Sequence, residues 1–236
     1  MALAEELRAA VGSLTVFGRS DARARPQTLA AALAFYPAVG LLLGLVASGV
    51  AWAVDQSYPA FGGAAGVLVL AALSGARAAR ALAAAGALGV STAGLAFAAR
   101  LWSVTGLPAP ALTAALLVAP MLGRWAIVVQ CYGGVPGAAS GPAALAGRAR
   151  FREFGVASVT AFGVTLAIAD AAGLVVVVAA ALTTVALRVY GYRRAGGMTE
   201  RLLAATAELV EAVVMVAFAL LASPHEPGAA LALGPP

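Results

Sequence analysis

Residues 155–190 read GVASVTAFGVTLAIADAAGLVVVVAAALTTVALRVY, and Asp170 and Arg188 are the only charged side chains among them. A helix that crosses a bilayer needs about 20 apolar residues, so this stretch is too long for one crossing. A break near residues 170–173 divides it into two shorter apolar segments. We therefore predict two membrane helices that are joined by a tight turn at Asp170.

The composition of the whole chain agrees with a membrane protein. Of its 236 residues, 62% are hydrophobic and only 11% are charged, and the mean hydropathy is +0.95. A soluble domain usually carries about 25% charged residues, and one of this length has too small a core for so much apolar surface. The sequence therefore predicts an all-α, polytopic membrane bundle, because helices satisfy their own backbone hydrogen bonds in lipid.

Hydropathy predicts about seven transmembrane helices in a single domain, residues 1–222. The spans lie near residues 29–54, 60–75, 82–104, 110–131, 155–170, 173–190 and 202–222. Residues 1–28 form a predicted amphipathic segment on the membrane surface or against the bundle, with Leu3, Leu7, Val11 and Leu14 at helical spacing. The tail, residues 223–236, is predicted to be disordered.

The placement of arginine supports this segmentation, because basic residues are retained on the cytoplasmic side of a membrane. Between the predicted spans, arginine occurs only in every second segment, at Arg8, Arg19, Arg23, Arg25, Arg77, Arg80, Arg148, Arg150, Arg152, Arg193, Arg194 and Arg201. We expect a protein of the bacterial inner membrane with its N-terminus in the cytoplasm and its C-terminus outside.

Composition also excludes several classes of site. The arginines lie in short clusters between apolar stretches, so we expect no nucleic acid partner. Cys131 is the only cysteine and His225 the only histidine, which excludes an intrachain disulfide, a cysteine-based zinc site and a metal centre with several histidines. Any chemistry must use carboxylates, hydroxyls, arginines and the backbone.

Four charged side chains within the predicted spans are candidates for function, because ionisable groups are costly in lipid. Arg100 lies near the outer end of its span, where its side chain can snorkel to the interface. Arg124 and Glu208 lie at matching depths, about 10 and 9 Å from the inner ends of theirs, and Glu211 shares a face with Glu208. We predict that Arg124 and Glu208 pair, or that both line a polar cavity open to the cytoplasm. A purely structural ion pair is the alternative.

The segment before the last span combines arginines, glycines and a predicted helix start. Gly196 and Gly197 allow a ligand to approach the backbone, and Thr199 is a predicted helix cap. Arg193 and Arg194 beside a helix N-terminus are typical of a phosphate site. An ordinary interfacial turn is the alternative.

The longest polar loop, residues 132–154, contains the run Tyr132-Gly133-Gly134-Val135-Pro136-Gly137 and three further arginines, Arg148, Arg150 and Arg152. As the largest segment on the predicted cytoplasmic side, it is a candidate lid or substrate surface. A connection that lies on anionic lipid is the alternative.

Several motifs, in the same order along the chain, resemble those of the cobalamin-5′-phosphate synthase family (adenosylcobinamide-GDP ribazoletransferase). The matching pieces are Ser13-Leu14-Thr15, Phe35-Tyr36-Pro37-Ala38-Val39-Gly40-Leu41-Leu42-Leu43-Gly44, Leu88-Gly89-Val90-Ser91-Thr92-Ala93-Gly94, Gly123-Arg124-Trp125, and Gly196-Gly197-Met198-Thr199 followed by Glu208-Leu209-Val210-Glu211.

The resemblance implies a late step of vitamin B12 assembly. In that step α-ribazole, or its 5′-phosphate, is joined to adenosylcobinamide-GDP and GMP is released, so corrinoid and nucleotide substrates are the implied partners. The family is described as magnesium-dependent, which implies Mg²⁺ as cofactor. The implied catalytic residues are Arg124, Thr199, Glu208 and Glu211, the implied substrate-binding residues are Arg193, Arg194, Gly196 and Gly197, and the implied metal ligand is Glu200.

The chain departs from the family pattern after the second span. The family carries an acidic Asp-Gly-Leu-Ala-Asp-x-x-Asp-Gly motif there, whereas residues 74–86 contain no acid and two arginines, Arg77 and Arg80. Three interpretations stay open: an active transferase with a displaced metal site, an inactive member that binds corrinoid, nucleotide or an active paralogue, and an unrelated small-solute transporter. A homo- or hetero-oligomer also stays open.

Overall fold

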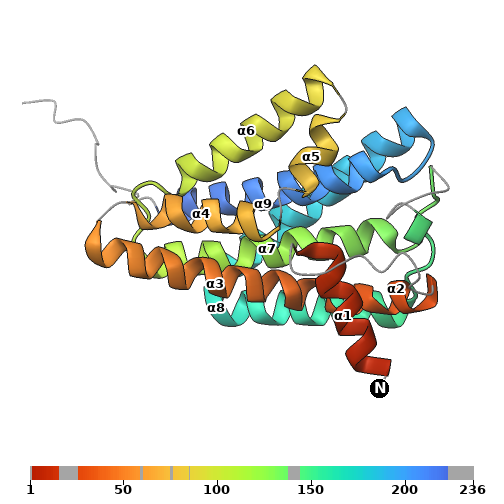
Figure 1. Ribbon diagram of the computed structural model, residues 1–236, viewed down its shortest axis with the longest axis horizontal. Coiled ribbons are helices and arrows are strands. Elements are labelled where there is room, and N and C mark those ends of the chain that lie inside the picture. Colours follow the sequence, from red (N-terminus) through yellow and green to blue (C-terminus); the bar gives the residue numbers. More distant parts are fainter. Residues whose placement is uncertain are drawn as a thin grey trace, which may run out of the picture.

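A computed structural model of the chain describes residues 2–15, 26–58, 61–74, 77–84, 86–137 and 144–222. Their helices are α1 (Ala2–Leu14), α2 (Pro26–Ala32), the 3₁₀ turn η1 (Leu33–Phe35), α3 (Tyr36–Ser57), α4 (Gly62–Leu73), α5 (Arg77–Ala83), α6 (Ala87–Val104), α7 (Ala109–Cys131), α8 (Phe151–Ala195) and α9 (Glu200–Ala222). Figure 1 shows that they form one elongated helical bundle. The predicted tail, residues 223–236, lies outside the described residues.

Five helical segments in this part of the chain are long and apolar enough to cross a membrane. They are Gln27–Ser57, Ala87–Val104, Ala109–Cys131, Phe151–Ala195 and Glu200–Ala222. The protein is therefore an integral membrane protein with a polytopic all-α architecture, which confirms the predicted fold class.

The chain reverses direction within α8, at Asp170, whose backbone has the non-helical angles φ 45° and ψ −130°. The ring of Tyr132 stacks on Phe154 at 4.6 Å, while its carbonyl oxygen accepts a hydrogen bond of 3.0 Å from Arg188. In a straight helix, residues 154 and 188 would lie about 50 Å apart. The halves of α8 are therefore antiparallel arms, and the turn falls where the sequence predicts two spans to meet.

Two other predicted spans differ from the helices observed. The predicted third span, residues 82–104, is interrupted at Gly86, whose φ of 84° suits glycine, so α5 ends at Ala83 and α6 begins at Ala87. The second, residues 60–75, contains only the 12 residues of α4. At about 1.5 Å per residue this helix is shorter than the hydrocarbon core, so the number of complete crossings stays a prediction.

The N-terminal helix α1 packs against α2 and α3. Ala10 is fully buried at this contact, and the Ser13 hydroxyl donates a hydrogen bond of 3.0 Å to the hydroxyl of Tyr36. Leu7 is 39% exposed. Helix α1 therefore lies against the bundle, one of the two positions that its apolar spacing predicts.

Helix α7 is the central element of the bundle, in contact with α3, α8 and α9 (Figure 1). Two glycines of α3 face it, and a Cβ atom would lie 2.4 Å from Pro120 O at Gly40 and 2.4 Å from Leu116 O at Gly44. Leu116 O is a carbonyl that the helix cannot use fully, because Pro120 has no amide hydrogen to donate to it. The backbones of α3 and α7 therefore meet directly, as small residues allow in membrane helices.

Replacing Gly44 by alanine tests this contact. The added methyl would collide with the α7 backbone, so we expect the free energy of unfolding to fall by about 1–3 kcal/mol. Gly49 is the matched control in the same helix, because a Cβ atom there has no neighbour within 4 Å. Gly49→Ala should be neutral, or stabilising by up to about 1 kcal/mol through helix propensity. Thermal unfolding in detergent micelles measures both, and equal losses would contradict the contact.

Candidate functional site

Two arginines and two glutamates form a buried charge cluster between α6, α7 and α9. Arg100, Arg124, Glu208 and Glu211 are each between 4% and 7% exposed. Arg100 donates through Nη2 to Glu208 Oε2 and through Nη1 to Glu211 Oε2, the latter over 2.9 Å. Arg124 Nη1 donates to Glu211 Oε1. Glu211 therefore bridges both arginines, and each positive charge in the cluster has a negative partner.

Local sequence explains how the carboxylates reach this position. Glu208 and Glu211 lie three residues apart in α9 and so share one face of that helix. Opposite them in α7, a Cβ atom at Gly123 would lie 2.7 Å from Glu211 Cγ and 3.1 Å from Ala207 O. Glycine beside Arg124 therefore allows α9 to approach closely enough for the ion pair to form.

The structure corrects the predicted pairing. Arg124 forms its ion pair with Glu211 rather than with Glu208, which is bonded to Arg100 instead. The side chains are at most 8% exposed, so the four residues are packed against one another and do not line an open cavity. The prediction that Arg124, Glu208 and Glu211 come together is confirmed, whereas the predicted partner of Arg124 is wrong and Arg100 was not among the predicted members.

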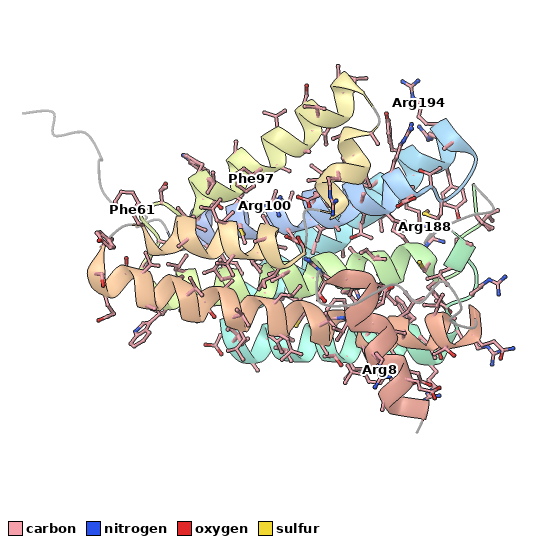
Figure 2. The ribbon with its side chains drawn as sticks, viewed as in Figure 1. Arg8, Phe61, Phe97, Arg100, Arg188 and Arg194 are labelled. Atoms are coloured by element: carbon pink, nitrogen blue, oxygen red, sulfur yellow. The ribbon has the colours of Figure 1, made fainter. Side chains whose placement is uncertain are left out.

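The snorkelling interpretation of Arg100 is wrong. Figure 2 shows Arg100 midway along the bundle, whereas Arg188 and Arg194 lie toward one end. Cα–Cβ bonds in a helix tilt toward its N-terminus. Arg100 lies near the C-terminus of α6, so its side chain is directed back into the bundle rather than out of it. That direction is readable from the sequence once the orientation of the helix is predicted.

Two loops that contain glycine, residues 132–137 after α7 and residues 196–199 after α8, pack against each other. They lie at the end of the bundle where α7 ends and α9 begins, which we call the arginine-rich end. Met198 N donates to Val135 O, and Gly137 N donates to Met198 O, each over 2.7 Å. A Cβ atom at Gly197 would lie 2.7 Å from Val135 O. The close approach that Gly197 was predicted to give a ligand is therefore occupied by the other loop. Gly196 ends α8 in the left-handed conformation, with φ 67°.

Thr199 caps α9, as predicted, because its Oγ1 accepts a hydrogen bond of 3.2 Å from Leu202 N. The cap is about 13 Å along the helix from Glu208 at 1.5 Å per residue. Thr199 therefore does not join the charge cluster. Arg193 and Arg194 are exposed in the last turn of α8, and Glu200 is exposed in the first turn of α9. The predicted site residues thus occupy two separate places, one buried and one at the surface.

Sequence reasoning missed two polar residues near this end. Arg188 donates to the carbonyl oxygens of Val129 and Tyr132, each over 3.0 Å, and so satisfies carbonyls at the C-terminus of α7. The fully buried Gln130 donates through Nε2 to Thr184 O and to Thr206 Oγ1, each over 3.1 Å. The sequence feature that could have identified Arg188 and Gln130 is a polar side chain near the inner end of an apolar span. They join α7 to α8 and α9.

Comparison with known proteins identifies the family. A sequence profile described as cobalamin-5-phosphate synthase matches residues 6–83 and 82–219. The chain belongs to the cobalamin-5-phosphate synthase family. Searches of curated proteins and of solved structures give no match. Membership of the cobalamin-5-phosphate synthase family supports a role in the late assembly step of cobalamin biosynthesis. The two matched blocks meet at residues 82–83, beside the stretch that lacks the family's acidic motif.

The carboxylates in the described part of the chain do not fit the Mg²⁺ that the cobalamin-5-phosphate synthase resemblance implies. Both oxygens of Glu211 accept from arginine, and Glu208 is bonded to Arg100. Glu200 lies apart at the surface, and no group of three or more acids, histidines or cysteines occurs among the described residues. Mg²⁺ requires near-octahedral oxygen ligands, and guanidinium groups occupy the places where such ligands would converge.

Charge balance in the cluster is testable by mutation. Arg100→Gln alone leaves a buried negative charge without its partner, and we expect a loss of about 3–5 kcal/mol in unfolding free energy. Arg100→Gln combined with Glu208→Gln removes one charge of each sign and keeps the Arg124–Glu211 pair. We expect this double variant to recover at least about 1 kcal/mol relative to the sum of the single changes.

The matched control is Arg100→Gln combined with Arg124→Gln, which removes two charges of one sign. This variant should be less stable than either single variant, because both carboxylates lose their arginines. Thermal unfolding of all variants in the same detergent gives the comparison. Additive losses in both double variants would contradict the described cluster.

Proposed function

We propose that this protein serves the step in which α-ribazole, or its 5′-phosphate, is joined to adenosylcobinamide-GDP with release of GMP. The observation that carries the proposal is the family match, which extends over residues 6–83 and 82–219 and so over almost all of the described bundle. In the reaction, an oxygen of the ribazole substrate forms a bond to the phosphorus that bears cobinamide. The bond from that phosphorus to the bridging oxygen breaks, and GMP departs.

The arginine-rich end of the bundle is the proposed location of this step, on the cytoplasmic side of the inner membrane. Both substrates are soluble, and adenosylcobinamide-GDP carries the charge of a diphosphate, so they reach the protein from water. Arg193 and Arg194 are exposed there, and the first amide groups of α9 lie beside the Thr199 cap. Helix N-termini and arginines both bind phosphate oxygens.

Phosphoryl transfer depends mainly on positioning and on neutralisation of phosphate charge. The described carboxylates do not form a magnesium site, so we propose that Arg193 and Arg194 contribute charge neutralisation in this chain. Glu200 lies in the first turn of α9, next to the cap, and is the carboxylate nearest in sequence to these groups. We propose that it accepts the proton when a ribazole hydroxyl is the attacking group.

A second candidate is a family member that binds the corrinoid or nucleotide substrate, or an active paralogue, without carrying out transfer. One observation favours it: residues 74–86 have arginines where the family has acids, and Glu208 and Glu211 are both engaged by arginine. Under this proposal the surface arginines hold a phosphate group, and the bond-breaking step takes place on another protein.

A direct assay of the purified protein tests the first proposal. The full chain in detergent is incubated with adenosylcobinamide-GDP and α-ribazole, with Mg²⁺ or with EDTA, and GMP and the cobalamin product are measured by mass spectrometry. We expect product in both conditions, and at least about a tenfold lower rate in Arg193→Gln/Arg194→Gln, because two phosphate-binding charges are removed. The control is Arg8→Gln, which makes the same substitution at an exposed arginine on α1, away from the proposed site, and should leave the rate unchanged.

The other outcomes select between the candidates. Absence of product together with binding of adenosylcobinamide-GDP that weakens in Arg193→Gln/Arg194→Gln would establish the second candidate and overturn the first. Product that appears only with Mg²⁺ would contradict arginine as the main neutralising group. Neither product nor binding would overturn both.

A further inference from the structure

A groove lined by arginine includes the last residues of the long polar loop, residues 132–154, and none of the residues of the charge cluster. It has a volume of about 580 Å³ and lies between α2 and the start of α8. Its lining residues are Gln27, Ala30, Ala31, Gly147, Arg148, Arg150, Arg152 and Glu153. The α2 side is made of small or neutral residues, so the charge of the groove comes from one wall. We call it the arginine groove.

The arginine groove has an excess of positive charge. Its one carboxylate, Glu153, is 8% exposed and accepts a hydrogen bond of 2.8 Å from the backbone amide of Arg150. This bond caps the start of α8. Among the described residues, none of the three groove arginines forms a recorded ion pair with a carboxylate. Three guanidinium groups therefore line a concavity in which Glu153, the only acid among its described residues, is already bonded to the backbone.

The surroundings of the arginine groove indicate that it opens at the membrane boundary. The helical segment Gln27–Ser57, long and apolar enough to cross a membrane, begins at Gln27 in one wall, and α8 begins at Phe151, between two groove arginines. The Phe151 side chain is 75% exposed, and Val159, two turns further along α8, is also 75% exposed. An exposed apolar ring at the start of a membrane helix suits the edge of the hydrocarbon, and the phosphate head groups lie directly beyond that edge.

We propose that the arginine groove binds the phosphate of an anionic phospholipid head group. Arginine presents paired donors to phosphate oxygens, and clusters of basic residues next to a span attract anionic lipid. The side chain of Arg148 is directed by a hydrogen bond of 3.1 Å from its Nε to Ala144 O, which leaves its two terminal nitrogens for a ligand. Exposed apolar side chains beside the groove favour a lipid over a free phosphate. This proposal does not depend on the proposed transferase function.

Binding of short-chain lipid to the purified full chain tests the proposal. Dioctanoyl phosphatidylglycerol is titrated into the protein in a neutral detergent, with dioctanoyl phosphatidylcholine and inorganic phosphate as comparison ligands. We expect phosphatidylglycerol to bind more tightly than both. Arg148→Gln/Arg152→Gln should weaken its binding at least about tenfold, because each basic residue near the surface contributes to attraction of anionic lipid.

The matched control is Arg193→Gln/Arg194→Gln, which removes the same charge from exposed arginines outside the groove. Its lipid affinity should change less than about threefold. Arg148→Lys/Arg152→Lys keeps the charge and should retain most of the binding, and thermal unfolding without lipid checks that each variant is folded. Equal loss in both glutamine pairs would overturn the proposal in favour of a general charge effect.

Two further outcomes would also overturn the proposal. If inorganic phosphate binds as tightly as phosphatidylglycerol and shows the same dependence on Arg148 and Arg152, the groove takes a soluble phosphate rather than a lipid. If phosphatidylcholine binds as tightly as phosphatidylglycerol, the groove does not recognise an anionic head group.

Discussion

The rest of the structure depends on the close approach of neighbouring helix backbones to α7. Lipid removes the hydrophobic effect as a force between helices, because lipid tails are as apolar as the helices themselves. Contact must then come from packing, and packing is best where no side chain separates the backbones. Gly40 and Gly44 provide this on the α3 side and Gly123 on the α9 side. The family's first-span signature is therefore, in this chain, a helix-packing motif.

The charge cluster follows from that approach and extends it to α6. Large side chains of α6 face outward, with Leu88 85%, Leu95 71% and Trp102 61% exposed, so apolar packing holds this helix only weakly. Arg100 connects it to both glutamates of α9. A buried charge that loses its partner is costly, so the cluster favours one position of α6 strongly even if its net contribution to stability is small. Two residues adjacent in sequence therefore have complementary roles. Gly123 lets α9 pack closely against α7, and Arg124 balances the charge of Glu211.

Sequence reasoning predicted the fold class, the turn at Asp170 and the Thr199 cap, because each depends on a local pattern: hydropathy, span length and capping chemistry. It predicted three of the four cluster members, Arg124 and Glu208 from their depth and Glu211 from the helix face that it shares with Glu208. It could not predict which carboxylate each arginine would meet, because partner choice depends on how helices are rotated against each other. The contact that Gly197 makes could not be predicted for a related reason. A glycine pair indicates that something approaches closely, but only the folded chain shows that Val135 does so.

The distribution of arginine gives this chain a different electrostatic character from the family pattern. The buried arginines are paired with glutamates within the charge cluster. The exposed arginines, at Arg193, Arg194 and in the arginine groove, face no recorded carboxylate partner among the described residues. A diphosphate group is negatively charged, so exposed arginines attract it. At ordinary salt this attraction extends over the Debye length, about 10 Å. A protein that has arginine where its family has acids can still attract the same anions. Under the proposed function, guanidinium groups fixed on the helices neutralise the phosphate charge in place of the metal that the resemblance implies.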